Sequence, residues 1–398
     1  MNMKGRFAFA SQYGWAKSSM IRAMRTEELT TNRHHSFRLL VLILLAASMF
    51  FVLQAVTRSQ TDFYNNLWAP AHLLVNGESP YDTTALQPEL PALWMPMAVG
   101  FFSFLGFFNF ETAQQIWFAL NITGMAALLY LSMPDSRFIP TLLAGLFFAY
   151  FFPPTINHFA LGQISILSAL SLLLSVRHVE RKPWLSAFFL ALGLVKPQIG
   201  FLIFFGLFIH LFQVGGFKRI FLYGLQTLLL ALILSLPLFI AEPNWIPNWI
   251  ASLQANTSEW THPSILSQID LGLGNWKYMP WGLLLLGIFW LVMRLWRNVP
   301  LHLAALWTLS LTVFITPYVW SWDFVLLLPL FVYIFSITNW KGKALLAIGY
   351  LLAWAGMAVI QLSDNFHNSR FWWVPSCFIG LLALASWLKL ENQMRSES

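Results

Sequence analysis

The chain has 398 residues, of which 58% are hydrophobic and only 10% are charged. This composition excludes an ordinary soluble domain and is typical of a polytopic membrane protein. A single cysteine, Cys377, excludes an intrachain disulfide framework and a cysteine-rich metal site. The formal net charge of +7 is explained by where the basic residues stand along the chain, so we expect no nucleic-acid partner.

The first 36 residues are basic and lack the apolar core and cleavage site of a signal peptide, so we expect 1–36 to be a cytoplasmic tail. Apolar runs suited to membrane helices then continue to residue 389. They cover 37–57, 113–133, 138–153, 163–179, 183–196, 198–214, 220–240, 279–296, 301–316, 322–338, 344–361 and 371–389. The sequence therefore predicts an all-α polytopic membrane domain over 37–389, with about 12 transmembrane helices, followed by a short cytoplasmic tail over 390–398.

Basic residues fall mainly on one side of the membrane if these runs alternate in direction. That side receives Arg33, Arg38, Arg177, Arg181, Lys182, Lys218, Arg219, Arg294, Arg297, Lys341, Lys343, Lys389 and Arg395, whereas the opposite side receives Arg58, Lys196, Lys277 and Arg370. The positive-inside rule then predicts that both termini are cytoplasmic. The two large loops, 58–112 and 241–278, are expected to face outward.

One apolar segment does not fit the alternation. Residues 92–110 are apolar enough to cross the membrane, but counting them as a span reverses every later helix. Trp94, Pro96 and the Gly/Phe-rich run after them favour an interfacial or re-entrant element. The alternative is that 92–110 crosses and 138–153 does not.

Four polar clusters share the outward side in this topology. They are 61–66 together with 76–82, then 157–163, 196–198 and 316–323. Asp62 is the leading candidate, because a carboxylate at the point where a membrane helix opens into a wet cavity indicates a functional site. The alternative is a carboxylate that is simply solvated at the end of its helix.

The other polar residues each have a structural alternative. Lys196 stands beside Pro197 on the side that is poor in basic residues, which favours a functional role over snorkelling to the headgroups. Gln163 is either a site residue or a hydrogen-bonding group between helices. Asp323 either lies in the site or pairs with Arg370 or Lys196. His158 is expected to be a local hydrogen-bonding group more than a catalyst.

The order of these elements resembles the integral-membrane glycosyltransferases of the GT-C superfamily, particularly glycosyltransferase family 87. The matching elements are Asp62-Phe63-Tyr64, Gly77 with Tyr81, Gly162-Gln163, Lys196-Pro197-Gln198, and Thr316-Pro317 with Trp320. The resemblance covers residues 40–335. Two departures concern substrate specificity: Trp94-Met95-Pro96 stands where the family has Tyr-x-Pro-Pro, and Asp323 stands where family members often carry a histidine.

The resemblance implies a GT-C-type bundle with short helices in the outward loops. It implies transfer of a hexose, often mannose, from a polyprenyl-phosphate donor to a lipid or glycan acceptor hydroxyl at the outer face of a plasma membrane. Asp62 is then the base, Lys196 binds the donor phosphate, and direct displacement inverts the anomeric carbon. The expected substrate-binding residues are Tyr64, Tyr81, His158, Gln163, Gln198, Trp320, Trp322 and Asp323.

No cofactor is expected, since a single phosphate does not require a metal ion and the outward loops have no recognisable ligand spacing; a divalent cation stays open. The alternative function is a transporter or flippase of a lipid-linked sugar, working from the same outward cavity. The sequence has no pseudo-repeat of the kind common in transporters. A third interpretation is a non-catalytic scaffold in an envelope-assembly complex.

Overall fold

The computed structural model describes residues 60–81, 92–134, 145–254, 262–269, 274–363 and 367–397, and all regular structure in these ranges is helical. The expected cytoplasmic tail over 1–36 and the first apolar run, 37–57, lie outside the described residues. The run 138–153 is described only from residue 145 onward. The predicted all-α class is therefore confirmed.

The described part of the first predicted loop, 58–112, contains short helices, as expected. It contains α2 (Thr61–Phe63), η2 (Tyr64–Trp68), α3 (Ala69–Val75), α4 (Pro96–Phe101) and η4 (Ser103–Phe107). η2 is a π-helical turn that ends two residues before Pro70. Proline has no N–H, so one carbonyl of the preceding turn lacks its usual α-helical donor. The segment 92–110 forms only α4 and η4, too short to span a bilayer.

The longer helices follow in chain order, and their ends carry recognisable signals. They are α5 (Phe110–Ser132), α7 (Pro153–Leu161), α8 (Ser165–His178), α9 (Pro183–Gly193) and α10 (Pro197–Leu234). Asn109 caps α5 by accepting a hydrogen bond from the N–H of Thr112 at 2.9 Å. Proline occupies the first turn of α7, α9 and α10, where its missing N–H is not needed.

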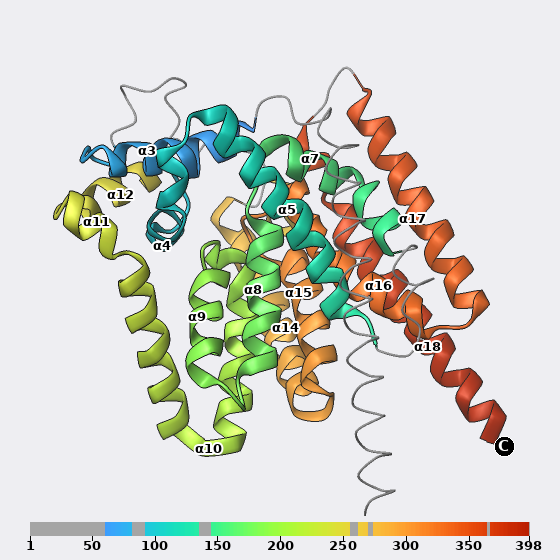
Figure 1. Cartoon of the computed structure of the whole chain (residues 1–398). Helices are drawn as coiled ribbons and strands as arrows, with labels where there is room; N and C mark the ends of the chain where they lie inside the picture. The colour runs from blue at the N-terminus through green and yellow to red at the C-terminus, as the bar shows by residue number, and fades with distance from the viewer. Residues whose placement is uncertain are drawn as a thin grey trace, which may run out of the picture. The chain divides into compact units, whose positions relative to one another are not determined.

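α10 is two helical arms joined at a pair of glycines. At ~1.5 Å per residue an unbroken helix of its length would extend about 57 Å, almost twice the ~30 Å bilayer core. Gly215 and Gly216 leave helical geometry, with φ +63° at Gly216, so the arms 197–214 and 217–234 run in different directions (Figure 1). The predicted runs 198–214 and 220–240 correspond to these arms and the start of α11.

The remaining helices complete the chain. They are α11 (Leu236–Ala241), α12 (Trp245–Gln254), α13 (Ile265–Ile269), η6 (Gly274–Lys277), α14 (Tyr278–Asn298), α15 (Leu301–Ile315), η7 (Ser321–Leu327), α16 (Leu328–Ile337), α17 (Trp340–Gln361), η8 (Asn368–Phe371) and α18 (Trp373–Glu397). α18 continues through residues expected to form the C-terminal tail. The described part of the second predicted loop, 241–278, also contains short helices.

Five of the described helices are long and apolar enough to cross a membrane, or six if α7 and α8, bent by 106°, form one broken span. The expected count of about 12 crossings is not reached by the described residues, because several of the predicted runs form helices shorter than the ~20 residues that a bilayer requires. α9, α15 and the pair η7–α16 are of this shorter kind. The chain is nevertheless a multi-pass membrane protein.

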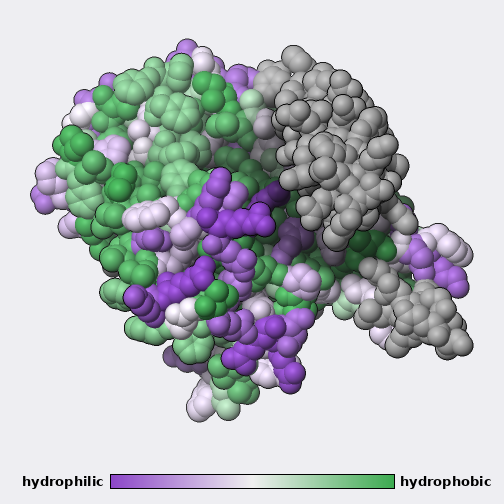
Figure 2. Space-filling view, turned by 60° about the horizontal axis from the view of Figure 1, so that its bottom comes forward, coloured by the Kyte–Doolittle hydropathy of each residue, from purple (hydrophilic) through white to green (hydrophobic). Residues whose placement is uncertain are grey.

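Basic side chains gather where the helices turn back at one end. Arg177, Arg181 and Lys182 lie between α8 and α9, Lys218 and Arg219 at the turn of α10, and Arg294 and Arg297 at the end of α14. These turns lie together at the bottom of Figure 1, and Figure 2, with that end brought forward, shows hydrophilic side chains gathered there. The described structure therefore has one basic end.

Candidate active site

A cavity of about 590 Å³ lies at the other end of the helices that lead to the basic turns. α8 runs from the cavity to Arg177, and the first arm of α10 runs from Lys196 toward Lys218. The wall contains six of the predicted site residues: Asp62, Gln163, Lys196, Gln198, Trp320 and Trp322. Its other residues are Asn65, Asn66, Leu93, Trp94, Met95, Val195, Pro197, Trp249, Leu253 and Tyr318.

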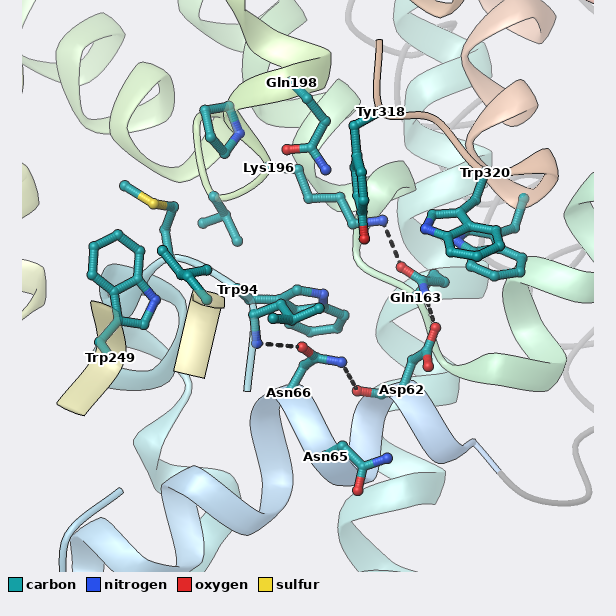
Figure 3. Close-up of a pocket in the computed structure, with 16 residues that line it drawn as sticks. Asp62, Asn65, Asn66, Trp94, Gln163, Lys196, Gln198, Trp249, Tyr318 and Trp320 are labelled. Atoms are coloured by element: carbon teal, nitrogen blue, oxygen red, sulfur yellow. Dashed lines mark hydrogen bonds between the residues drawn. The ribbon is translucent and has the colours of Figure 1, made fainter. Parts of the chain in front are cut away.

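Asp62 reaches the cavity from a helix whose start is tightly held. Gln60, which precedes that helix, is fully buried in a left-handed conformation with φ +39°. Its N–H donates to the carbonyl of Ala160 at 3.0 Å, which joins the first outward loop to α7. On the next turn, Asn66 donates to the Asp62 carbonyl at 3.1 Å and accepts from the N–H of Leu93 at 2.7 Å (Figure 3).

Gly162 brings the second polar cluster against Asp62. It ends α7 with φ +69°, the left-handed conformation that glycine adopts without a steric penalty. A Cβ atom built there would lie 2.6 Å from Cβ of Phe63 and 3.1 Å from Cβ of Gln60. Indole Nε1 of Trp117 donates to the Gly162 carbonyl at 2.7 Å and fixes the turn. Close packing and the left-handed backbone therefore require glycine at position 162.

The amide of Gln163 joins the two principal candidates. Its Nε2 donates to carboxylate Oδ2 of Asp62, and its Oε1 accepts from Nζ of Lys196 at 2.6 Å (Figure 3). Because an amide has one donor end and one acceptor end, this orientation satisfies both neighbours at once. The predicted base, Asp62, and the predicted phosphate-binding residue, Lys196, thus face one cavity and are bridged by the side chain of Gln163.

Lys196 is the last residue before α10 and is 6% exposed. Besides Gln163, its ammonium donates to Oγ of Ser165 and to Oδ1 of Asp323, each at 3.0 Å. The ion pair with Asp323 is buried, and a buried ammonium is tolerated only when it is paired and fully hydrogen-bonded. Of the sequence alternatives for Asp323, pairing with Lys196 is therefore found, while Arg370 is exposed.

Asp323 lies behind the cavity wall and is fully buried. It accepts hydrogen bonds from Ser165 Oγ at 2.5 Å and from the backbone N–H of Trp320 at 3.1 Å, in addition to Lys196. These bonds fix the start of η7 and the direction of the lysine. In this structure the side chain anchors the lysine and does not line the cavity.

Aromatic rings form the wall around this polar centre. Trp320 and Trp322 are stacked, with ring centroids 4.8 Å apart and an interplanar angle of 10°. Tyr318 stands beside them on the wall, and Trp249 lies on the opposite side of the cavity from Trp320 (Figure 3). A flat ring surface next to hydrogen-bonding groups is suited to a ligand that is apolar on one face and polar at its edge, such as a sugar.

Besides Asp323, three other predicted site residues do not line the cavity. Tyr64 packs on Trp68 and Phe110, with centroids 5.1 Å and 5.0 Å away. Tyr81 lies against Trp245 at 6.3 Å. His158 is fully buried, with Nε2 3.1 Å from the Asn121 side-chain oxygen, as expected of a local hydrogen-bonding group.

Several wall residues were not singled out from the sequence. Asn65, Asn66 and Tyr318 stand inside the polar clusters, so a closer reading of those clusters could have found them. Nothing in the sequence distinguishes Trp249 from the other tryptophans of the predicted loop 241–278. Nothing local in the sequence marks Leu93, Val195 or Leu253, because their place on the wall depends on how distant segments meet.

Burial changes the acidity of the proposed base. Removal from water raises the pKa of Asp62 from 3.8 to about 6, although the charge of Lys196 and the hydrogen bond from Gln163 act in the opposite direction. A carboxyl with this pKa is ionised at neutral pH and more basic than an exposed aspartate. Among the described residues no three histidine, cysteine or acidic side chains come together as a metal site.

A comparison with known protein families matches residues 93–329 to Glycosyltransferase family 87. The chain belongs to this family. Glycosyltransferase family 87 is a family of GT-C membrane glycosyltransferases, so the chain is a membrane glycosyltransferase, as the resemblance in the sequence implied. No curated protein matches the chain significantly.

The family match also divides the site. Gln163, Lys196 and the Trp320–Asp323 segment fall inside the matched residues, whereas Asp62 precedes them. Asp62 joins the family's part of the chain through the contacts of Gln163 and Gly162. The candidate site is thus assembled from the matched residues and from the segment that precedes them.

Substituting alanine for Gly162 tests the close packing that carries this assembly. The left-handed backbone alone should cost about 1–2 kcal/mol of unfolding free energy, and the clash with Phe63 should add to it. Displacement of Gln163 should lower turnover about 100-fold. Thermal unfolding in detergent and a sugar-transfer assay measure the two effects.

Gly77→Ala is the matched control. Gly77 has a similar φ of +76°, but a Cβ atom there would meet nothing within 4 Å. This variant should show only the backbone effect on stability and keep its turnover. Equal losses of turnover in the two variants would contradict the role given to the Gly162 contact.

Proposed function

We propose that this family 87 glycosyltransferase moves a hexose, of mannose type, from a polyprenyl-phosphate donor to a hydroxyl of a lipid or glycan acceptor. The observation that carries the proposal is the continuous chain of polar contacts from Asp62 through Gln163 to Lys196 on one cavity wall. A base and a cation held in one cavity are the two groups that glycosyl transfer from a lipid phosphate requires.

The reaction is a single displacement. The acceptor hydroxyl loses its proton to the Asp62 carboxylate as its oxygen bonds to the anomeric carbon. The bond from that carbon to the phosphate oxygen breaks, and the phosphate leaves with the electron pair. Lys196 offsets the charge that develops on the phosphate. Attack from the face opposite the leaving group inverts the anomeric carbon, and a second catalytic carboxylate is not needed.

The lipid-linked donor is supported by how polarity is divided along the cavity wall. The carboxylate, amide and ammonium groups lie near Trp320, whereas Trp249 lies across the cavity, with Leu253 one helical turn further along α12 (Figure 3). Leu93, Met95, Val195 and Pro197 add apolar surface. A substrate with a polar head and a hydrocarbon chain matches such a wall.

A single phosphate on the donor is supported by the charge of the site. Lys196 is the one cation on the described cavity wall, and its ammonium already faces Asp323. One lysine shared in this way offsets the charge of a monophosphate better than that of a diphosphate. Gln163 and Gln198 then bind sugar hydroxyls, and Trp320 and Trp322 stack on the sugar ring.

We further propose that the cavity opens to the exterior of a plasma membrane and that both termini are cytoplasmic. The support is the basic end formed by the turns after α8, within α10 and after α14, because short basic loops stay in the cytoplasm. α8 and the first arm of α10 lead from that end to the cavity. The enzyme then takes its lipid-linked substrates from the outer leaflet.

Membranes containing the chain should transfer radiolabelled sugar from a polyprenyl-phosphate donor into a new glycolipid or glycan, and Asp62→Asn should reduce this transfer by about 100-fold or more. The asparagine keeps the shape of the side chain but cannot accept the proton. Folding and insertion should be intact, as judged by detergent extraction and size-exclusion chromatography. Near-normal turnover in the variant would show that Asp62 is not the base. Movement of intact donor between leaflets without transfer would indicate a flippase.

Replacing Lys196 by alanine should lower kcat about 100-fold and raise KM for the donor, while KM for the acceptor stays the same. The variant also leaves Asp323 buried without a counter-ion, which costs about 3–5 kcal/mol of stability. The double variant Lys196→Met with Asp323→Asn removes both charges and should recover stability without recovering donor use. Lys182→Ala, an exposed lysine at the basic end, is the control. Unchanged donor kinetics would leave Lys196 a purely structural residue.

The pH dependence of kcat/KM should report the raised pKa of Asp62. Transfer needs the carboxylate, so the rate should fall as pH is lowered through about 6 and be level above it.

The stability of the fold should change with pH in the opposite direction. Because the folded pKa lies above the unfolded value, the contribution of Asp62 is present below the unfolded pKa and is lost as pH rises through about 6. A pH–rate profile with a midpoint near 4 would contradict the buried base.

A further inference from the structure

His262 contacts the aromatic wall of the cavity from a distant part of the chain. It begins the described segment 262–269, just before α13, in the second outward loop. Its side chain is half-buried. More than fifty residues separate it in sequence from the wall segment that it touches, and no motif in the sequence marks it.

The contacts of His262 are made by its ring. The ring centroid lies 4.3 Å from that of Tyr318 and 4.7 Å from that of Trp320, and the imidazole meets Trp320 at an angle of 86°. These edge-on and tilted arrangements are the favoured ones for aromatic pairs. Both partners line the cavity.

No hydrogen bond fixes the Nδ1 side of this ring within the described residues, since Nδ1 is buried there without a partner. Burial lowers the pKa of His262, while the charge of Asp323 raises it, so the imidazole is neutral at pH 7. The contacts of this ring with the cavity wall are its aromatic contacts with Tyr318 and Trp320.

Tyr318 and Trp320 depend on such packing because their backbone is not helical. They lie in the irregular stretch between α15 and η7, where the chain bends at Tyr318 and Trp320 is extended with φ −114° and ψ +159°. The Ser321 backbone is held by Asn368, whose side-chain oxygen accepts from the Ser321 N–H at 3.2 Å. Trp322 covers one face of Trp320. His262 supports the Trp320 ring from another side.

We propose that His262 is a positioning residue that fixes the rings of Tyr318 and Trp320 and thereby sets the surface on which the donor sugar stacks. This inference rests on the proposed function, because it assigns the sugar to that wall. It gives the second outward loop a part in substrate recognition. The imidazole acts through its ring and not as an acid or base.

The test compares His262→Ala, which removes the ring, with His262→Phe, which keeps a ring and removes both nitrogens. Loss of one aromatic contact of about 1.4 kcal/mol corresponds to about a tenfold change in affinity. We expect His262→Ala to raise KM and the dissociation constant Kd for the donor about tenfold with little change in kcat, and His262→Phe to restore both constants. His262→Leu fills the volume without an aromatic ring and should show the same tenfold loss of donor affinity. It serves as the test if the alanine variant does not fold.

His367→Ala is the matched control, since His367 is an exposed histidine outside the wall, and it should leave donor binding and turnover unchanged. Normal donor binding in His262→Ala or His262→Leu would overturn the proposal. A phenylalanine variant as defective as alanine, with kcat reduced, would also overturn it, because the nitrogens would then be required. Equilibrium binding of labelled donor is measured alongside transfer. A wild-type protein that binds the donor but transfers no sugar would contradict the proposed function and leave the role of His262 in donor binding testable.

Discussion

The geometry of the site depends on the orientation of one buried amide. Gln163 donates to Asp62 and accepts from Lys196. Rotating its amide by half a turn would place the amide oxygen against the Asp62 carboxylate and the amide NH2 against the Lys196 ammonium. The amide is held in place by the backbone at Gly162, which approaches Phe63 so closely that a side chain is excluded. A base and a cation can therefore share a cavity without forming a direct ion pair, which would neutralise both.

Packing around the site explains how these buried polar groups are tolerated. Phe63, Ile164 and Val195, the immediate neighbours of Asp62, Gln163 and Lys196, belong to one buried apolar cluster with Trp94 and Trp117. Burying that cluster offsets the desolvation of the charged groups beside it. The same burial raises the pKa of Asp62 to about 6 and so prepares a carboxylate that is ionised yet basic at neutral pH.

The arrangement of the helices separates the chemistry from the basic end of the protein. α8 and the first arm of α10 each begin at the cavity and end at basic turns, and α15 leads from the turn after Arg297 back to the wall at Tyr318. In the proposed reaction, the donor phosphate is bound at the cavity and not at the basic end. Lys196 is the one cation on the described cavity wall.

The amino-acid sequence by itself determined the helical class, the membrane environment, the one-sided distribution of basic residues and the family, because hydropathy and motif order are local properties of the chain. It also predicted Asp62, Gln163, Lys196 and the two wall tryptophans, whose residue types stand out in an apolar chain. The described residues hold five or six helices suited to crossing, so the count of about 12 is not shown, because run length alone does not tell a spanning helix from a short or broken one. Only the tertiary structure decided that Asp323 anchors Lys196 and that Tyr64, Tyr81 and His158 stay off the wall. It also decided that Trp249 lines the wall and that His262 contacts Tyr318 and Trp320 on it. Those outcomes depend on contacts between segments far apart in the chain, and no local pattern records them.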